Sequence, residues 1–465
     1  MNPNKNLNGS KDYFFLSFCG ILLFLWFLLG LIDIELLFAL LIIVCLELVL
    51  TYKTKKFGTK FLNITVSISA FLITVIFCEL VLRYNYVSDF KLYPNPKLPV
   101  VSRHIPNRVL EDPACYGDLT PLIGDKSLGE KNYYKVKTDN LGFTNGRNIS
   151  KKDTFDLIIL GDSYSVTDYF RLDESLGSWP AIFQKQNDYG IMNLAMIGTG
   201  PWEQYINLLQ ELPHLNLRDN CTLLWCFFSG NDLDDHYGNT TILDEVPKSD
   251  AYQELRIRLE NFREQSALKI MLLKIYTNEL DNIKPDAVKV INALDLNNVM
   301  YYKPHIKNSK RSLNEIISHP NFDMLVQTID AVNKIASGHS LNLKLLVFPS
   351  KAEVYSWMIE EKEPWTFKND SLSFSTAIKQ ICYEYSIDFY DLTPYFKNIS
   401  QEVYLKTGNL LYDRDGSHWN FLGHIATQNY IQAKILSNSS SYNDPYFLFS
   451  EKLDSLGEVI LGEFE

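Results

Sequence analysis

The chain has 465 residues, which is long enough for more than one domain. Its 55 acidic and 44 basic side chains give a formal net charge of −11, and no basic stripe follows the first hundred residues, so a nucleic-acid partner is not expected. Apolar residues make up 46 % of the chain, and their concentration in the first 85 positions sets that region apart.

Three apolar runs near the N-terminus predict a membrane anchor at residues 1–85. The run from Tyr13 to Ile32 is long enough to cross a bilayer as a helix. The second run, about Ile34 to Leu50, is either a tight span or a re-entrant helix, and the third covers about Phe61 to Leu82. A cleaved signal peptide would have a shorter apolar core and no further runs. We therefore predict a multi-pass membrane protein in contact with the lipid bilayer.

The lysines indicate how this anchor is oriented. Four of them lie between the second and third runs, at positions 53, 55, 56 and 60. Because positively charged loops stay in the cytoplasm, the third span should deliver everything after about Arg83 to the extracytoplasmic side.

Four cysteines would then face an oxidising space, where pairing among them is an open possibility: Cys115, Cys221, Cys226 and Cys382. Their spacing resembles no metal site. The sequence therefore indicates neither a metal nor a cofactor.

The chain after the anchor divides into three further regions. Residues 86–150 are predicted to form a linker followed by an accessory strand and turn, within 133–146. Residues 151–440 carry regular apolar runs and form the main domain, and 441–465 are an acidic C-terminal tail. Within the main domain, residues 240–339 are polar with helical periods, so we predict a helical insertion there; whether it lies over the functional site as a cap is left open by the sequence.

Short apolar runs alternate with helical segments through the main domain. Strands are predicted at 156–160, 190–198, 221–232, 341–350 and 386–393, with helices at 175–186, 202–212 and 374–385. Apolar runs without strict alternation are typical of parallel strands that are buried on both faces. The predicted fold is thus a three-layer α/β/α sandwich around a parallel five-stranded sheet.

Polar motifs follow several of these strands, at the edge where open parallel sheets bind ligands. Gly161-Asp162-Ser163 ends the first strand, a glycine-containing loop with Gly198 and Gly200 ends the second, and Gly230-Asn231-Asp232 ends the third. Beyond the fifth strand comes 413-DRDGSHWNFLGH-424.

These residue types suit acyl transfer, which needs a nucleophile, a base and donors aimed at an oxyanion. Ser163 supplies a hydroxyl, Asn231 an amide, and Gly198 a backbone N–H without a side chain to obstruct it. Asp415 and His418 are three positions apart, so one tight turn is expected to present both. Gly200 is the alternative to Gly198, and Asp413 competes with Asp415 at a longer spacing.

The four motifs, in this order, resemble the SGNH (GDSL-type) hydrolase superfamily over roughly Thr154 to Ala433. The segments VKTDNLGF and FPSKAEVY also resemble membrane-anchored members associated with envelope polysaccharides. The position after the serine is often leucine in that family and is Tyr164 here.

The resemblance implies a Ser163, His418 and Asp415 catalytic triad and an oxyanion hole made by Ser163, Gly198 and Asn231. It further implies an extracytoplasmic, membrane-anchored serine esterase that removes O-acetyl groups from a glycan without a cofactor or metal. The partners expected are an acylated glycan or another ester, the bilayer and other envelope polysaccharide proteins. Two alternatives remain open at this point: an O-acyltransferase that uses the same triad, and a non-catalytic glycan-binding or assembly protein.

Overall fold

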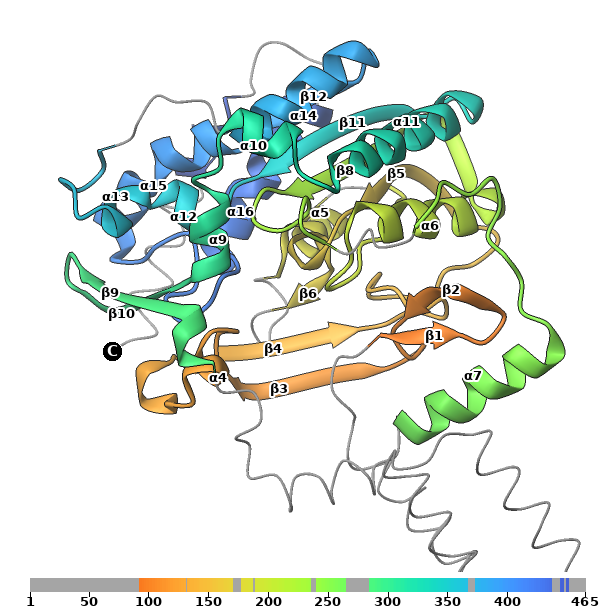
Figure 1. Ribbon diagram of the computed structural model, residues 1–465, viewed down its shortest axis with the longest axis horizontal. Helices are drawn as coiled ribbons and strands as arrows, with labels where there is room; N and C mark the ends of the chain where they lie inside the picture. Colours follow the sequence, from red (N-terminus) through yellow and green to blue (C-terminus); the bar gives the residue numbers. More distant parts are fainter. Residues whose placement is uncertain are drawn as a thin grey trace, which may run out of the picture. The chain divides into compact units, whose positions relative to one another are not determined.

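The computed structural model describes residues 92–130, 132–169, 177–186, 189–235, 240–264, 284–366, 373–436, 444–446 and 449–450 (Figure 1). All three predicted membrane runs lie outside these residues. Among the described helices, none combines the length and the apolar character that a bilayer crossing needs. The chain divides into two compact units, one of residues 1–102 with 247–281 and one of residues 103–246 with 282–465.

The described part of the first unit is small. Strands β1 (Tyr93–Asn95) and β2 (Leu98–Arg103) pair within the segment predicted as a linker. Helix α7 (Ala251–Glu264) packs on β1, where Asn261 donates from Nδ2 to the carbonyl of Pro94 at 2.8 Å. The polar sequence of α7 agrees with the helical period predicted for the insertion.

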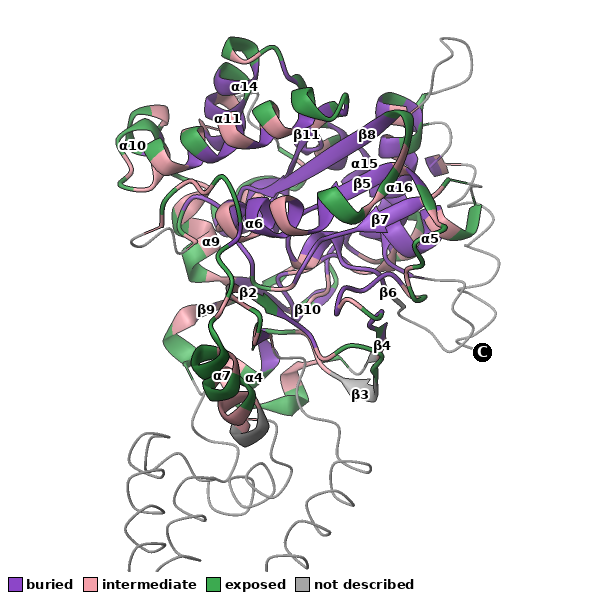
Figure 2. Cartoon of the chain, turned by 90° about the vertical axis from the view of Figure 1, so that its right-hand side faces the viewer, coloured by how far each residue is buried: buried purple, intermediate pink, exposed green. Residues whose placement is uncertain are grey.

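A five-stranded parallel sheet forms the centre of the second unit, as predicted. Its order is β12-β11-β8-β5-β7, with bounds Asp388–Asp391, Asn342–Phe348, Asn216–Phe228, Thr154–Leu160 and Ile191–Asn193. The long β8 is the central neighbour of both β5 and β11, with Leu160 opposite Trp225 and Phe348 opposite Phe228. Its last residues are all buried (Figure 2), which explains why an uninterrupted apolar run encodes it.

Helices cover both faces of this sheet. The chain moves from β5 outward to β7 and then back across β5 to β8, so right-handed crossovers put α5 (Trp179–Gln186) and α6 (Pro201–Glu211) on opposite faces. Helix α16 (Phe421–Tyr430) packs on α5, and α11 (Phe322–Gly338) packs on α6 (Figure 1). Helix α14 (Ser373–Glu384) packs on β12, and together these layers give the predicted α/β sandwich.

The predicted helical insertion differs from the structure in two ways. Residues 288–302 form a β-hairpin of β9 (Val288–Ala293) and β10 (Leu296–Tyr302), because apolar and polar residues alternate there and a tight turn at Leu294 joins the strands. Helix α11 is also no part of an insertion. It is the crossover between β8 and β11, and it buries the side chains of Leu325, Ile329 and Val332 against the sheet domain.

A smaller antiparallel sheet precedes the main one in the chain. It contains β3 (Val109–Cys115), β4 (Asn132–Lys137) and β6 (Asp168–Tyr169), in that order. After β4, Asn145 exchanges two hydrogen bonds with the backbone of Asn193, donating at 3.0 Å and accepting at 2.7 Å. The segment at 133–146 therefore packs beside the end of β7.

The cysteines that the structure describes with their side chains are not paired. Cys221, Cys226 and Cys382 are buried and free, and burial raises the pKa of the Cys221 and Cys382 thiols to about 12. The pairing among these three that the sequence left open does not occur, because each thiol is a small core side chain within the α/β unit.

Candidate active site

The loop after β5 presents Ser163 at the carboxyl end of the sheet. Asp162 caps the short 3₁₀ turn Ser163–Ser165 by accepting from the backbone N–H of Tyr164 at 3.0 Å. A side chain at Gly161 would place its Cβ 2.6 Å from Oγ of Ser165, so the chain reverses here only with glycine. This arrangement explains why a buried strand ends in Gly-Asp-Ser. β5 and β8 flank the point where the strand order reverses, and Ser163 and Asn231 follow them.

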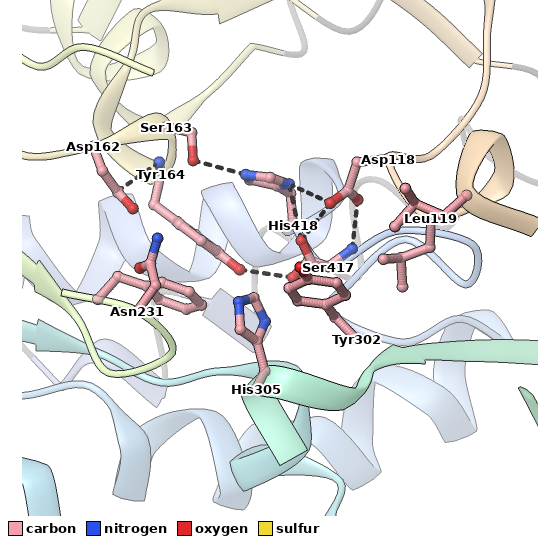
Figure 3. Close-up of a pocket in the computed structure, with 12 residues that line it drawn as sticks. Asp118, Leu119, Asp162, Ser163, Tyr164, Asn231, Tyr302, His305, Ser417 and His418 are labelled. Atoms are coloured by element: carbon pink, nitrogen blue, oxygen red, sulfur yellow. Dashed lines mark hydrogen bonds and ion pairs between the residues drawn. The ribbon is translucent and has the colours of Figure 1, made fainter. Parts of the chain in front are cut away.

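His418 lies on a tight loop between α15 (Thr393–Thr407) and α16, and it reaches Ser163. The Oγ atom of Ser163 and Nε2 of His418 are 2.7 Å apart (Figure 3). The loop is closed by a hydrogen bond from the backbone N–H of Asp413 to the carbonyl of His418 at 3.0 Å. The two residues that the sequence predicts as nucleophile and base are thus in hydrogen-bond contact, although 255 positions separate them.

The carboxylate beside His418 is Asp118, which the sequence analysis did not single out. Its Oδ2 atom is 3.6 Å from Nδ1 of His418, on the ring nitrogen opposite Ser163 (Figure 3). Asp118 also accepts from the backbone N–H and the hydroxyl of Ser417, both at 2.6 Å. The Ser417 hydroxyl lies 3.3 Å from Nδ1 as well, so it bridges the carboxylate and the imidazole. Asp118 follows β3 in a segment predicted to be accessory, with no local pattern to mark it.

Asp415, the predicted orienting residue, has a different position. Its buried carboxylate accepts from the backbone N–H of Gly117 at 2.8 Å, from the hydroxyl of Thr120 at 2.7 Å and from the N–H of Glu130 at 3.1 Å. Within the part of the chain that the structure describes, no hydrogen bond or ion pair joins it to His418.

The direction of the Asp415 side chain explains why its carboxylate does not face His418. The tight turn aims it inward, where it holds the loop that carries Asp118. The backbone carbonyl of Asp415 also accepts from Leu119 at 3.1 Å. A Cβ at Gly117 would lie 2.5 Å from Asp415, so glycine is required for this contact. Among the described residues, the carboxylate of the competing candidate, Asp413, likewise makes no hydrogen bond or ion pair with the His418 ring, and its backbone N–H and carbonyl serve the turn.

Tyr164, which follows Ser163, packs against His418. Its ring lies between those of Phe228 and His418, with centroids 4.1 and 4.8 Å away. Its hydroxyl donates to the carbonyl of Ser417 at 2.6 Å. Because leucine has no such hydroxyl, this residue gives the loop of His418 an anchor that the sequence pattern alone did not suggest.

The charges of the site favour an imidazolium in the resting state. Burial lowers the pKa of His418, but the nearby carboxylate of Asp118, a hydrogen bond to it, and the charges of Asp162 and Asp413 raise the pKa to about 9. Burial raises the pKa of Asp118, but the imidazole and the hydrogen bonds from Ser417 hold it well below its usual range. The side chains of His418 and Asp118 keep 38 % and 42 % of their exposure, so water weakens their attraction.

If His418 acts as a general base, its raised pKa predicts an alkaline activity profile. A general base must be neutral, and below its pKa His418 is protonated and unable to accept the proton of Ser163. We expect kcat/KM to rise about tenfold per pH unit and to reach half its maximum near pH 9, the pKa of His418. The measurement is a pH profile on an ester without ionisable groups, corrected for spontaneous hydrolysis. A half-maximum at or below the usual histidine pKa of about 6.5 would contradict it.

Asn231 lies across the site from His418 and lines the same cavity (Figure 3). Its Oδ1 atom is buried without a hydrogen-bond partner among the described residues. Its backbone carbonyl accepts from Asp234 and Asp235 at 2.7 and 2.9 Å, so a tight turn fixes the residue. An asparagine amide carries one acceptor oxygen and two N–H donors.

Two residues that follow the β9–β10 hairpin in the chain hold the loop of Asn231 in place. Asn308 donates from Nδ2 to the carbonyl of Gly230 and to Asp234, both at 2.6 Å, and Arg311 forms a two-pronged ion pair with Asp234 at 2.7 and 2.9 Å. Asn308 ends α9 (Lys303–Asn308), which follows β10 directly. The region predicted as a helical insertion thus contacts the site from the side of Asn231.

Gly198 is placed differently from the other predicted donors. It is exposed, with φ of 68°, and a Cβ at this position would meet nothing within 4 Å. It is not among the residues that line the cavity at Ser163. Because this left-handed backbone conformation favours glycine, Gly198 is explained as a turn residue. Gly200, the alternative, caps α6, and its N–H donates to Glu203 at 3.1 Å. The structure therefore brings Ser163, Asn231 and His418 to one cavity without either glycine.

The cavity has a volume of about 200 Å³. Aromatic and aliphatic side chains form much of its wall, and the polar ones gather around Ser163. The lining residues are Asp118, Leu119, Leu122, Asp162, Ser163, Tyr164, Phe228, Asn231, Tyr302, His305, Ser417 and His418. Tyr302 ends β10 and His305 belongs to α9, so the region predicted as an insertion supplies one wall (Figure 3).

The described residues contain no group of three or more histidine, cysteine or acidic side chains arranged to hold a metal ion. No protein-family model matches the chain, and no curated protein matches it either, so the geometry of the site carries the case for a function.

Proposed function

We propose that this protein is a serine esterase. The observation that carries the proposal is the 2.7 Å contact between Oγ of Ser163 and Nε2 of His418, with Asp118 at the other ring nitrogen. Acyl-enzyme chemistry needs a hydroxyl, an imidazole and a carboxylate that contact one another in this order.

In the proposed reaction, Oγ of Ser163 attacks the carbonyl carbon of the ester while His418 accepts the hydroxyl proton. Asp118 stabilises the imidazolium that forms, and the Asn231 amide is a donor candidate for the oxyanion. Collapse of the tetrahedral intermediate breaks the ester bond, and His418 returns the proton to the departing alcohol. A water molecule, deprotonated by His418, then attacks the acyl carbon, and His418 returns the proton to Oγ of Ser163 as the acid leaves.

The cavity favours a short, uncharged acyl group such as acetyl. Its volume of about 200 Å³ is below the ~300–1,000 Å³ of pockets that enclose drug-sized ligands. None of the described residues that line it is lysine or arginine, and Asp118 and Asp162 would repel an anionic group there. The half-buried ring of Tyr302 in the cavity wall suits the apolar face of a sugar ring. We accordingly propose an O-acetylated glycan as the substrate.

The proposed location is the extracytoplasmic face of the cell membrane. The apolar runs at 13–32, 34–50 and 61–82 and the lysines between the last two support a multi-pass anchor with the catalytic unit outside. Glycans of the envelope would then be within reach of the site.

Covalent labelling tests the proposal directly. A fluorophosphonate probe should label the full chain, since the probe requires a serine hydroxyl activated by a base. The untreated protein should also hydrolyse a chromogenic acetyl ester, and preincubation with the probe should abolish this hydrolysis. Absence of both labelling and hydrolysis would exclude the enzyme and leave a non-catalytic glycan-binding protein.

Acyl transfer to a sugar hydroxyl is the second candidate. The wall of Tyr302 and His305, opposite the Asp118 side of the cavity, offers room and a ring nitrogen for an acceptor. Water and a hydroxyl compete for the same acyl-enzyme, so the two reactions differ only in the acceptor. Measuring free acetate and acetylated glycan together, with donor ester and glycan both supplied, separates them: acetate alone supports the esterase.

A further inference from the structure

Lys351 is a buried lysine whose ammonium group is surrounded by backbone carbonyls. The residue is 3 % exposed. Its Nζ atom donates to the carbonyls of Asp413 at 2.6 Å, Met300 at 2.8 Å, Arg414 at 3.0 Å and Gly416 at 3.1 Å. Lysine is seldom buried without a carboxylate partner, so this position requires a specific reason.

These carbonyls belong to two segments that build the candidate active site. Three of them lie on the loop at 413–416, which leads directly into Ser417 and His418. The fourth is on β10, two residues before Tyr302 in the cavity wall. A further hydrogen bond, from the N–H of Met300 to the carbonyl of Arg414 at 2.7 Å, joins the same segments. One side chain thus ties the loop of the base to the wall of the cavity.

The amine of Lys351 meets only hydrogen-bond acceptors, whether it is charged or neutral. An ammonium group has three N–H donors and no acceptor, and four carbonyl oxygens share them here. Burial lowers the pKa of Lys351 to about 7, while the carboxylates of Asp413, Asp118 and Asp415 act in the opposite direction. The ring of Tyr301, whose centroid is 5.2 Å from Nζ, adds a cation–π contact.

The backbone of Lys351 is itself held at the end of the sheet. Lys351 is the first residue of α12 (Lys351–Val354), where Ser350 and Glu353 form a capping box with bonds of 2.6 and 2.9 Å. The buried Glu353 also accepts from the hydroxyl of Ser229, two residues before Asn231. The segment 350–353 therefore contacts the loops of both Asn231 and His418, from a helix that follows β11.

We propose that Lys351 is a positioning residue, which holds the loop at 413–418 so that His418 meets Ser163 and Asp118 in one geometry. The inference rests on the proposed esterase function. Without Lys351 the four carbonyls would lose a shared donor, and fewer contacts would hold the segment that leads into Ser417 and His418. A misplacement of about 1 Å of a catalytic group can cost about 10²-fold in rate.

The test compares Lys351→Met with Lys344→Met in the full chain. Lys344 is the matched control, because it lies on β11 and donates from Nζ to the carbonyl of Ile435 at 2.7 Å, yet it lines no part of the cavity. Labelling with the fluorophosphonate probe counts the active sites, so that kcat refers to folded protein only. Lys351→Gln, which retains two donors, is measured in parallel as the milder change.

For Lys351→Met we expect kcat per labelled site to fall about 10²-fold with KM within a factor of about three, and Lys351→Gln to fall less. The rising limb of the kcat/KM profile should move to lower pH, because a displaced His418 loses the attraction of Asp118. A lysine that only stabilises the fold would lower the amount of labelled protein and leave kcat and the limb unchanged.

The inference would be overturned if Lys351→Met, Lys351→Gln and Lys344→Met had the same kcat and the same pH dependence of kcat/KM. If Lys351→Met yields no labelled protein, the Lys351→Gln result decides. An unlabelled and inactive wild-type chain would instead overturn the esterase proposal, so the two failures are distinct.

Discussion

Replacing Ser163 by alanine is expected to lower kcat for acetyl-ester hydrolysis by on the order of 10⁶-fold, the loss seen when a triad nucleophile is removed. Alanine removes only the Oγ atom that lies 2.7 Å from His418. The backbone of Ser163 stays in its 3₁₀ turn, capped by Asp162. The loss should therefore appear without a change in the unfolding temperature, and it should be accompanied by loss of probe labelling.

Ser165→Ala is the matched control for this experiment. Ser165 lies in the same turn, and its buried Oγ has no hydrogen-bond partner among the described residues. It does not line the cavity. Its alanine variant should keep activity within a few-fold of the wild type. Equal activity in Ser163→Ala and the wild type would exclude Ser163 as the nucleophile, whatever the control shows.

The second largest expected effect is the difference in kcat between Asp118→Asn and Asp415→Asn. Asp118→Asn should lower kcat by about 10⁴-fold, because the neutral amide no longer stabilises the imidazolium or selects the ring tautomer. It should also move the rising limb of the pH profile from about 9 toward the usual histidine value, since Asp118 is the main group that raises the pKa of His418. Both kcat and the pH profile are measured on the same ester.

Asp415→Asn should behave differently. The Asp415 carboxylate serves Gly117, Thr120 and Glu130, so an amide there weakens the support of the Asp118 loop without removing the charge beside His418. We expect a loss of stability of about 1–3 kcal/mol, the usual effect of a compromised buried hydrogen-bond group. The fall in kcat should be much smaller than for Asp118→Asn. The reverse order of the two kcat values would return the orienting role to Asp415.

The sheet was predictable because its information is local. Apolar runs mark most of the sheet, and the runs at 156–160, 341–350 and 386–393 match β5, β11 and β12 to within a few residues. Burial on both faces demands such runs wherever parallel strands are covered by helices. The hairpin of β9 and β10 was missed, because a short alternating pair within a polar region is a weaker signal than the helical periods around it.

The site was predictable only in part. Ser163 and Asn231 follow adjacent strands and His418 lies in a conspicuous loop, so the chemistry of the motifs indicated them. Tyr164 was passed over because its role depends on reaching the carbonyl of Ser417, 253 positions away. Lys351 belongs to a segment that the resemblance pointed to, yet nothing in that segment specifies which carbonyls its ammonium contacts.

The sequence by itself determined the class of fold, the serine and histidine that meet at the sheet edge, and the apolar runs that suggest an anchor. Only the tertiary structure decided which carboxylate faces the imidazole. Spacing along the chain placed Asp415 three residues from His418, but a tight turn aims neighbouring side chains in different directions. Asp415 is directed inward to hold a loop, and that loop brings Asp118 to His418. Spacing along the chain predicts which side chains meet only in a regular helix or strand, and this turn is neither.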